Sequence, residues 1–350
     1  MDRVSKLRKV MKERSISVFF ISKMEDIAWL SGFTGSTAYI VITDEEQLFI
    51  TDGRYKEQSR LEIGDGWKTT IVRRYGEEFN KVAKTYKDIT LQPSTPAYLW
   101  DLFAKAKAKV SVDTADSVQE LRMVKTPEEL EILRGEYNLA GGAFLQALER
   151  WQYGQTERHW AAELEYQMKL KGARGASFDT IVASGVRGAL PHGVASDKVI
   201  LNGEAVTIDF GSLTRYTSDY TRVVYNGSDR DILKVINIVR EALESAMHAV
   251  KSGVYTSTLD KVARDHIEKS GFGEYFNHGL GHGVGMEVHE LPSINASSDI
   301  VLKPSMVFTI EPGIYIPDKF GVRLEETVIV TESSCELLSS VLDRYIYNVN

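Results

Sequence analysis

The stretch from Phe276 to Pro292 constrains the fold most, because glycines occupy four alternate positions, 279, 281, 283 and 285, and three of the chain's seven histidines lie beside them. Repeated glycine opposes a helix, and a glycine backbone lets another group approach closely. The stretch therefore predicts a loop or strand that displays His278, His282 and His289. A glycine-rich turn with solvated histidines is the alternative when the stretch is considered alone.

Two familiar motifs do not fit this stretch. A dinucleotide-binding loop needs a third glycine five residues after the first, where this chain has Val284 or Met286. A zinc-protease helix needs Glu directly after the first of two histidines four residues apart, but a glycine follows His278. The spacing therefore excludes both a phosphate-binding loop and a zinc-protease helix.

The composition is that of a globular protein. The chain has 350 residues, enough for two domains, and 43% of them are hydrophobic. A formal net charge of -7 argues against nucleic acid or an anionic membrane as the main partner. The single cysteine, Cys335, excludes an intrachain disulfide and is typical of a buried thiol in a reducing compartment.

The N-terminal residues do not resemble a signal peptide. They are charged from the second residue, and Val4, Leu7 and Met11 recur at helical spacing. No apolar run approaches the roughly 20 residues that a membrane span needs. We therefore expect a cytoplasmic protein.

Residues 1–118 predict a small α/β domain. After the charged helix come runs rich in β-branched and aromatic residues at 17–21, 38–43 and 47–51. Residues 44–46 predict a hairpin-type connection between the second and third strands.

Residues 119–350 predict a second domain that begins with a long helix. Thr126 as N-cap, Pro127 at the first helical position and Glu129 three residues after the cap form a capping box, and the helix should reach about residue 150. Further helices are expected at about 156–171, at 228–251 with residue 228 as the cap, and at 257–270. Strands are expected between and after these helices.

Four carboxylates lie on predicted strands. Strand alternation turns Asp209 away from the apolar face, and Asp219 can meet it across a hairpin. Glu311 ends an apolar strand, and Glu325 lies within a run, 322–330, that predicts one continuous strand. Each alone would be a surface carboxylate, but four that converge without a cation would repel one another. A divalent metal would remove that repulsion.

These residues stand in the order of a known family. The segments around them resemble the proline-specific peptidases of the pita-bread fold, aminopeptidase P and prolidase (metallopeptidase family M24). The matching segments are Asp-Phe-Gly, Ser-Asp-Tyr-Thr-Arg, Gly-His-Gly-Val-Gly, Thr-Ile-Glu-Pro-Gly and Val-Arg-Leu-Glu. Gly-Phe-Thr-Gly-Ser from residue 32 and Thr-Asp-Gly-Arg-Tyr from residue 51 are similar to the family's N-terminal domain. The resemblance implies a creatinase/prolidase-type α/β domain followed by a pita-bread catalytic domain, a curved antiparallel sheet covered by helices.

The resemblance also implies a dinuclear metal site. Asp209 would chelate one metal, Asp219 and Glu325 would bridge two, and His282 with Glu311 would complete the second. Four carboxylates and one imidazole suit Mn or Co best, with Zn possible. A hydroxide that bridges paired metals would be the nucleophile.

Further residues take roles that the resemblance implies. Glu311 would act as general base and acid, passing the water proton to the leaving amine. His192 and His289 match the family's non-ligand histidines and would hold the substrate and stabilise the tetrahedral intermediate. Arg323 would fix a carboxylate, and His278 would give support without binding metal.

The chain departs from the family in two places. The family usually separates its two aspartates by eleven positions, whereas Asp209 and Asp219 are ten apart. Because the segment around Asp219 is intact, we expect the hairpin tip to absorb the missing residue and Asp219 to keep its face. Many prolidases also carry, after the counterpart of His289, an arginine that receives the dipeptide carboxylate, and residues 291–294 offer none.

The sequence favours an Xaa-Pro aminopeptidase, which releases the N-terminal residue from small peptides with proline second. The alternative with the same chemistry is an Xaa-Pro dipeptidase (prolidase). An alternative of another class is a catalytically inactive, peptidase-like binding module, although such modules typically lose metal ligands and this chain keeps all five. The resemblance further implies a homodimer.

Overall fold

Two compact units, Met1–Arg122 and Met123–Asn350, make up the computed structural model, which describes residues 2–349. The division lies four residues after the boundary expected at residue 118. Helix α6 (Ser117–Met123) accounts for the difference, because its Arg122 forms a buried ion pair with Asp26 of the first unit, with 2.6 Å between the charged atoms.

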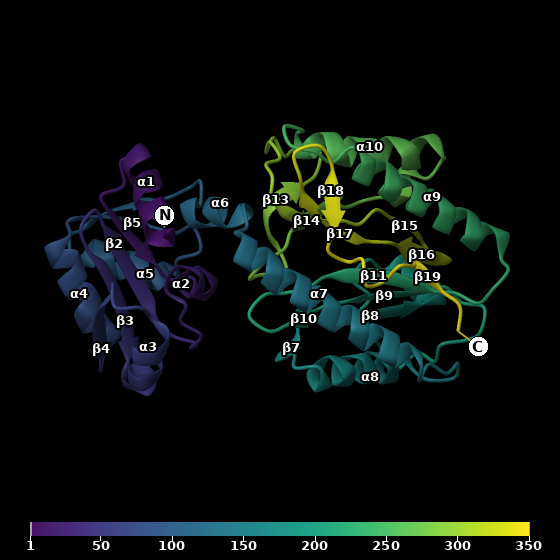
Figure 1. Ribbon diagram of the computed structural model, residues 1–350, viewed down its shortest axis with the longest axis horizontal. Helices are drawn as coiled ribbons and strands as arrows, with labels where there is room; N and C mark the ends of the chain where they lie inside the picture. The colour runs from purple at the N-terminus through teal and green to yellow at the C-terminus, as the bar shows by residue number, and fades with distance from the viewer. Residues whose placement is uncertain (1, 350) are drawn as a thin grey trace. The chain divides into compact units, whose positions relative to one another are not determined.

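The first unit is built on strands and helices that alternate along the chain (Figure 1). Its elements are α1 (Arg3–Glu13), β1 (Val18–Ile21), α2 (Met24–Ser31), β2 (Tyr39–Thr43), β3 (Gln47–Asp52), α3 (Lys56–Glu62), β4 (Lys68–Val72), α4 (Tyr75–Thr85), β5 (Asp88–Leu91), α5 (Ala97–Lys105) and β6 (Lys109–Val112). The strands form one mixed sheet in the order β4-β3-β2-β1-β5-β6. The three strands and the hairpin expected before residue 52 are therefore confirmed.

Apolar side chains fix the helices of the first unit to this sheet. Val4, Leu7 and Met11 of α1 are buried, as their helical spacing predicts. Phe79 of α4 and Phe103 of α5 pack edge-on against Phe20 of β1.

In the second unit, helices α7 and α8 precede strands β7 to β11, and helices α9 and α10 precede strands β12 to β19. Its helices are α7 (Pro127–Leu148), α8 (Glu157–Leu170), α9 (Arg230–His248) and α10 (Thr256–Lys269). Its strands are β7 (Gly175–Ala176), β8 (Ile181–Ser184), β9 (Val206–Phe210), β10 (Ser212–Leu213), β11 (Tyr220–Val224), β12 (Gly281–Gly283), β13 (Glu290–Ile294), β14 (Val307–Ile310), β15 (Gly313–Ile316), β16 (Phe320–Arg323), β17 (Glu326–Val330), β18 (Cys335–Leu337) and β19 (Ile346–Tyr347).

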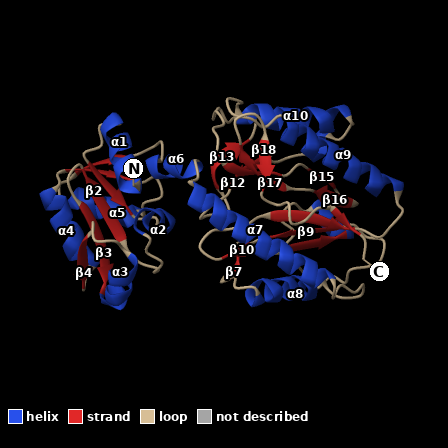
Figure 2. Cartoon of the chain, viewed as in Figure 1, coloured by secondary structure: helices blue, strands red, loops and turns tan. Residues whose placement is uncertain are grey.

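Two larger sheets position the residues of interest. One has the order β19-β11-β9-β8 and the other the order β13-β12-β14-β17-β18, and two-stranded ladders join β10 to β7 and β15 to β16. Helices α7 and α8 cover the four-stranded sheet, while α9 and α10 pack on the five-stranded sheet and on β15 and β16 (Figure 2). The predicted sheet covered by helices is thus present. Among the described residues, no helix is both long and apolar enough to cross a membrane.

Local signals predicted the helix starts well, with one correction. The capping box at Thr126 is present, since Thr126 and Glu129 each accept the other's main-chain N–H. Helix α9, by contrast, is capped by Asp229 and not by Ser228, because the Asp229 carboxylate accepts two N–H groups of the first turn.

The run 322–330 is not one strand. It divides at Leu324 and Glu325 into β16, which pairs with β15, and β17, which pairs with β14. The expectation of a continuous strand was wrong because the two halves of the run pair with different strands. The break places Glu325 between two sheets.

Candidate metal centre

Three carboxylates converge in the second unit. Asp209 lies on β9, Asp219 directly precedes β11, and Glu325 lies between β16 and β17. One oxygen of each lies within 4.8 Å of the others. Asp209 pairs with Thr221 across the β9–β11 ladder, so Asp219, two residues earlier, is diagonal to Asp209 on the same face. The missing residue is therefore absorbed at the hairpin tip, as expected.

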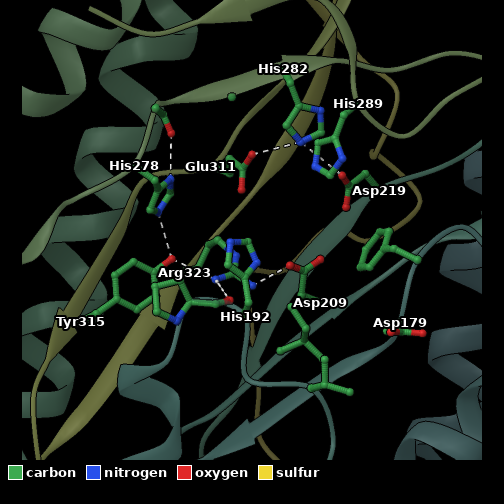
Figure 3. Close-up of a pocket in the computed structure, with 16 residues that line it drawn as sticks. Asp179, His192, Asp209, Asp219, His278, His282, His289, Glu311, Tyr315 and Arg323 are labelled. Atoms are coloured by element: carbon green, nitrogen blue, oxygen red, sulfur yellow. Dashed lines mark hydrogen bonds and ion pairs between the residues drawn. The ribbon is translucent and has the colours of Figure 1, made fainter. Parts of the chain in front are cut away.

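His282 and Glu311 approach the carboxylates from the other sheet. His282 Nε2 lies 3.2 Å from Glu311 Oε1 and 3.6 Å from Asp219 Oδ2 (Figure 3). His282 Nδ1 lies 3.2 Å from the carbonyl oxygen of Gly283. A carbonyl can only accept, so Nδ1 carries a proton. Nε2 in turn donates to Glu311, and although burial lowers the pKa of His282, the hydrogen bond and charge of Glu311 outweigh it and raise that pKa above its ordinary value. Loss of the Nε2 proton would leave Nδ1–H on the Gly283 carbonyl and free Nε2 to bind a metal.

Close backbone packing explains the glycines around His282. A Cβ atom at Gly281 would lie 2.0 Å from the carbonyl oxygen of Thr309, and one at Gly283 would lie 2.2 Å from that of Leu291. The stretch forms strand β12 between β13 and β14, which confirms the expected loop or strand that another group approaches closely.

Only one of the converging carboxylates, Asp209, has an arginine ion pair among the described residues, with Arg323. Burial and the neighbouring Glu325 and Asp209 raise the pKa of Asp219 well above its usual value. Burial, Glu311 and Asp209 do the same to the pKa of Glu325. Burial also raises the pKa of Glu311, but the hydrogen bond and charge of His282 outweigh it and hold that pKa at about 2. Protons thus take the place of cations in the metal-free protein.

The donor set fits divalent cations. Asp209 Oδ1 and Glu325 Oε1 are buried, and no hydrogen-bond partner reaches them within residues 2–349. Buried carboxylate oxygens without partners are costly unless a cation or proton binds them. Carboxylates with one imidazole are hard ligands of the kind that manganese and related ions prefer.

Arg323 joins the cluster to the pocket wall. Its Nη2 donates to Asp209 Oδ2 at 2.5 Å, and its Nη1 donates to the hydroxyl of Tyr315 at 2.8 Å. Its Nε donates to Thr221 Oγ1 at 3.2 Å, and the Thr221 hydroxyl donates to Glu325 at 2.9 Å. Arg323 therefore orients two of the carboxylates, one directly and one through a threonine.

A pocket of about 400 Å³ opens above these residues. Its lining comprises Phe178, Asp179, Ile181, Pro191, His192, Val194, Asp209, Asp219, His278, Gly279, Gly281, His282, His289, Glu311, Tyr315 and Arg323. The exposed side chains of His192 and His289 belong to this lining, and the His289 ring centroid lies 4.2 Å from that of His282 (Figure 3). Glu325 is buried behind the lining.

The family model of metallopeptidase family M24 matches residues 131–332, more than half of the chain. The chain belongs to metallopeptidase family M24. Residues 3–124 match the creatinase/prolidase N-terminal domain, so the first unit also has the expected type.

Full-length relatives and structures agree with this M24 assignment. The Xaa-Pro dipeptidase of Pyrococcus furiosus is 40% identical over 346 residues, which cover 97% of each chain. The prolidase structure from Pyrococcus horikoshii matches with a TM-score of 0.91 and 37% identity, covering 96% of this chain and 97% of that one. An X-Pro aminopeptidase structure from Thermotoga maritima matches with a TM-score of 0.90 and 40% identity over all of both chains. The expected pita-bread fold is confirmed.

The structure places the carboxylates, histidines and arginine expected from the sequence in and around one pocket, but sequence reasoning missed Asp179 of the lining and several polar contacts. The structure brings the five expected ligands together, with His192, His289 and Arg323 on the same pocket. It also places Tyr315 between Arg323 and His278, whose Nε2 accepts from the tyrosine hydroxyl at 3.0 Å. Tyr315 lies four residues after Glu311, but only the pairing of β15 with β16 brings it beside Arg323.

Proposed function

We propose that the protein is a dinuclear metal-dependent Xaa-Pro dipeptidase, which hydrolyses the bond between the first residue and the proline of a dipeptide. The cluster of partnerless buried carboxylate oxygens at the floor of a small pocket carries the hydrolase part of the proposal. Similarity over 97% of each chain to the Pyrococcus furiosus enzyme supports the dipeptidase part. This choice replaces the aminopeptidase that the sequence favoured.

Five residues would hold two divalent cations. Asp209 would bind one, His282 and Glu311 the other, and Asp219 with Glu325 would be shared, an assignment that their convergence supports. Mn or Co suits this oxygen-rich set best, and Zn is possible. When bound, the paired cations lower the pKa of a water molecule and polarise the scissile carbonyl.

The protein's own groups would move the proton and orient the substrate. Glu311 would accept the water proton and deliver it to the proline nitrogen as the bond breaks; although burial raises its pKa, the neighbouring His282 outweighs this and keeps the carboxylate ionised. His192 and His289 line the pocket and would donate hydrogen bonds to the substrate carbonyl oxygen, where negative charge develops. Arg323 keeps Asp209 in place through the 2.5 Å ion pair.

An Xaa-Pro aminopeptidase is the second candidate. Within the described chain, Arg323 is the one arginine or lysine in the pocket lining, and four hydrogen bonds already engage its guanidinium. A dipeptide carboxylate therefore lacks a free cation in this pocket, whereas a longer peptide does not need one there. The 40% identity to the Thermotoga maritima X-Pro aminopeptidase also favours this candidate.

A matched pair of substrates tests the proposal. Metal-stripped protein is reconstituted separately with Mn, Co and Zn and incubated with an Xaa-Pro dipeptide and with the corresponding Xaa-Pro-Yaa tripeptide. The dipeptidase proposal expects dipeptide cleavage, which Glu311→Gln should slow by a factor of about 100 or more. Cleavage of the tripeptide alone would transfer the assignment to aminopeptidase. No cleavage with any metal would remove the enzyme proposal and favour a binding module.

A further inference from the structure

Helix α7 contacts the hairpin that carries Asp219 through several of its side chains. Glu136 accepts hydrogen bonds from the hydroxyls of Ser212, at 2.5 Å, and of Thr214. Seven residues earlier on the same helix, Glu129 accepts a hydrogen bond from the hydroxyl of Tyr216 at 2.7 Å. The hairpin that is one residue short is therefore attached to a neighbouring helix and does not depend on its own turn alone.

The contact nearest the metal centre is made by Tyr137. This side chain is fully buried, and its hydroxyl accepts the main-chain N–H of Asp219 at 3.2 Å while donating to Thr327 Oγ1 at 2.8 Å. The Thr327 hydroxyl lies 3.5 Å from the carbonyl oxygen of Asp219. One hydroxyl thus contacts both the backbone of one ligand and the strand that begins directly after another, Glu325.

The position of Asp219 makes this hydrogen bond important. The β9–β11 ladder begins with the pair Phe210 and Tyr220, so Asp219 lies one residue before the strand that orients it. Without the Tyr137 hydroxyl, a buried N–H would lose its acceptor, and the ligand backbone would be free to shift. Thr327 lies on β17 of the five-stranded sheet, so the same hydroxyl also joins the two sheets beside the carboxylates.

We propose that Tyr137 is a positioning residue of the metal centre: its hydroxyl fixes the backbone of Asp219 against β17 and so sets the separation of Asp219 and Glu325. The inference rests on the proposed metal centre, in which these two carboxylates are shared between the cations. Partners of metal ligands typically change metal affinity by about 10- to 100-fold when removed. Tyr137 would act through Asp219, without contact to substrate or metal.

The test compares two buried tyrosines whose hydroxyls have different partners. Tyr137→Phe removes the hydroxyl beside Asp219. The control, Tyr220→Phe, removes an equally buried hydroxyl that donates to the Tyr137 carbonyl oxygen at 3.0 Å, between the same helix and the same strand. Thr327→Val removes the other partner of the Tyr137 hydroxyl with little change of shape.

Metal affinity is the readout, so the result does not depend on which peptide is cleaved. The dissociation constant for Mn²⁺ is measured by titration calorimetry on the metal-free full-length chain, the visible absorption of bound Co²⁺ reports ligand geometry, and thermal unfolding of the metal-free proteins reports structural damage. Tyr137→Phe should raise the dissociation constant about 10-fold and alter the Co²⁺ spectrum, and Thr327→Val should act in the same direction. The Mn²⁺ dissociation constant of Tyr220→Phe should stay within about twofold of the wild-type value, although this variant should lose about as much thermal stability as Tyr137→Phe.

Three results would overturn the inference. A Tyr137→Phe protein that binds Mn²⁺ with wild-type affinity would show that the hydroxyl serves stability only, as would equal losses of affinity in both tyrosine variants. A wild-type protein that binds no divalent metal would overturn the metal centre itself together with this inference. Failure to cleave peptides, by contrast, would bear on the proposed function alone.

Discussion

Replacing Asp219 with Asn should stabilise the metal-free protein while it removes a metal ligand. The ligand oxygens of Asp219, Asp209 and Glu325 lie within 4.8 Å of one another. Two ionised carboxylates at that separation repel by about 3.5 kcal/mol at an effective dielectric constant near 20. Because protons bound to the carboxylates relieve much of this repulsion, the gain should be smaller. We expect Asp219→Asn to raise the free energy of unfolding of the metal-free protein by about 1–3 kcal/mol near pH 8.

The sign of the pH dependence follows from the direction of the pKa shift. Burial and the neighbouring carboxylates raise the pKa of Asp219 above its unfolded value of about 3.9, so the folded state retains a proton that the unfolded state releases. The contribution of Asp219 to stability is therefore present below about pH 4 and is lost as the pH rises through the folded pKa. The advantage of the variant should be largest near pH 8 and should disappear toward pH 4.

Urea denaturation of chelator-treated proteins at several pH values measures this difference. Excess Mn²⁺ should reverse the order, because only the wild-type protein gains binding energy. Asp197→Asn, at an exposed carboxylate paired with Arg158, is the matched control and should show no such pH-dependent gain. A metal-free Asp219→Asn protein that is less stable than wild type near pH 8, or a difference that does not vary with pH, would refute the reasoning.

Three further predictions address the site and its support. Arg323→Lys should lower kcat/KM for an Xaa-Pro dipeptide about 10- to 100-fold, because one ammonium group cannot hold Asp209, Tyr315 and Thr221 together; steady-state kinetics would contradict this if the value were unchanged. Thr126→Ala should cost about 1 kcal/mol in the free energy of unfolding, since the capping box at α7 is lost, and an unaltered urea midpoint would count against that role. Treatment with EDTA should abolish peptide hydrolysis and Mn²⁺ should restore it, whereas hydrolysis that survives chelation would exclude a metal-dependent mechanism.

Features set by neighbouring residues could be predicted from the sequence. The capping box at Thr126 and the buried face of α1 depend on spacing within one or two turns, and both are present. The convergence of the carboxylates could be predicted because each lies on an apolar strand or next to one, where an unpaired charge requires an explanation.

Features set by pairing between distant strands could not be predicted. Periodicity within 322–330 is the same whether the run has one partner strand or two, so it could not reveal the break at Glu325. The contacts of Tyr137 with Asp219 and Thr327 join residues 82 and 190 positions apart in the chain. A tyrosine on the buried face of a helix carries no sign of such partners in its own sequence neighbourhood. The sequence likewise could not show whether Ser228 or Asp229 caps α9, because both residue types are good caps; in the structure Asp229 is the cap.

The origin of the ligands in two separate sheets has a consequence for the dynamics of the second unit. Asp209 lies on β9 and Asp219 directly before β11, whereas His282 lies on β12 and Glu311 directly after β14. Ions held by all four would oppose any separation of the sheets, so loading should slow amide hydrogen exchange in both sheets together, far beyond the residues that touch the ions. The proposed ligands all lie in the second unit, so amide exchange in the first unit is the control and should not change on metal loading.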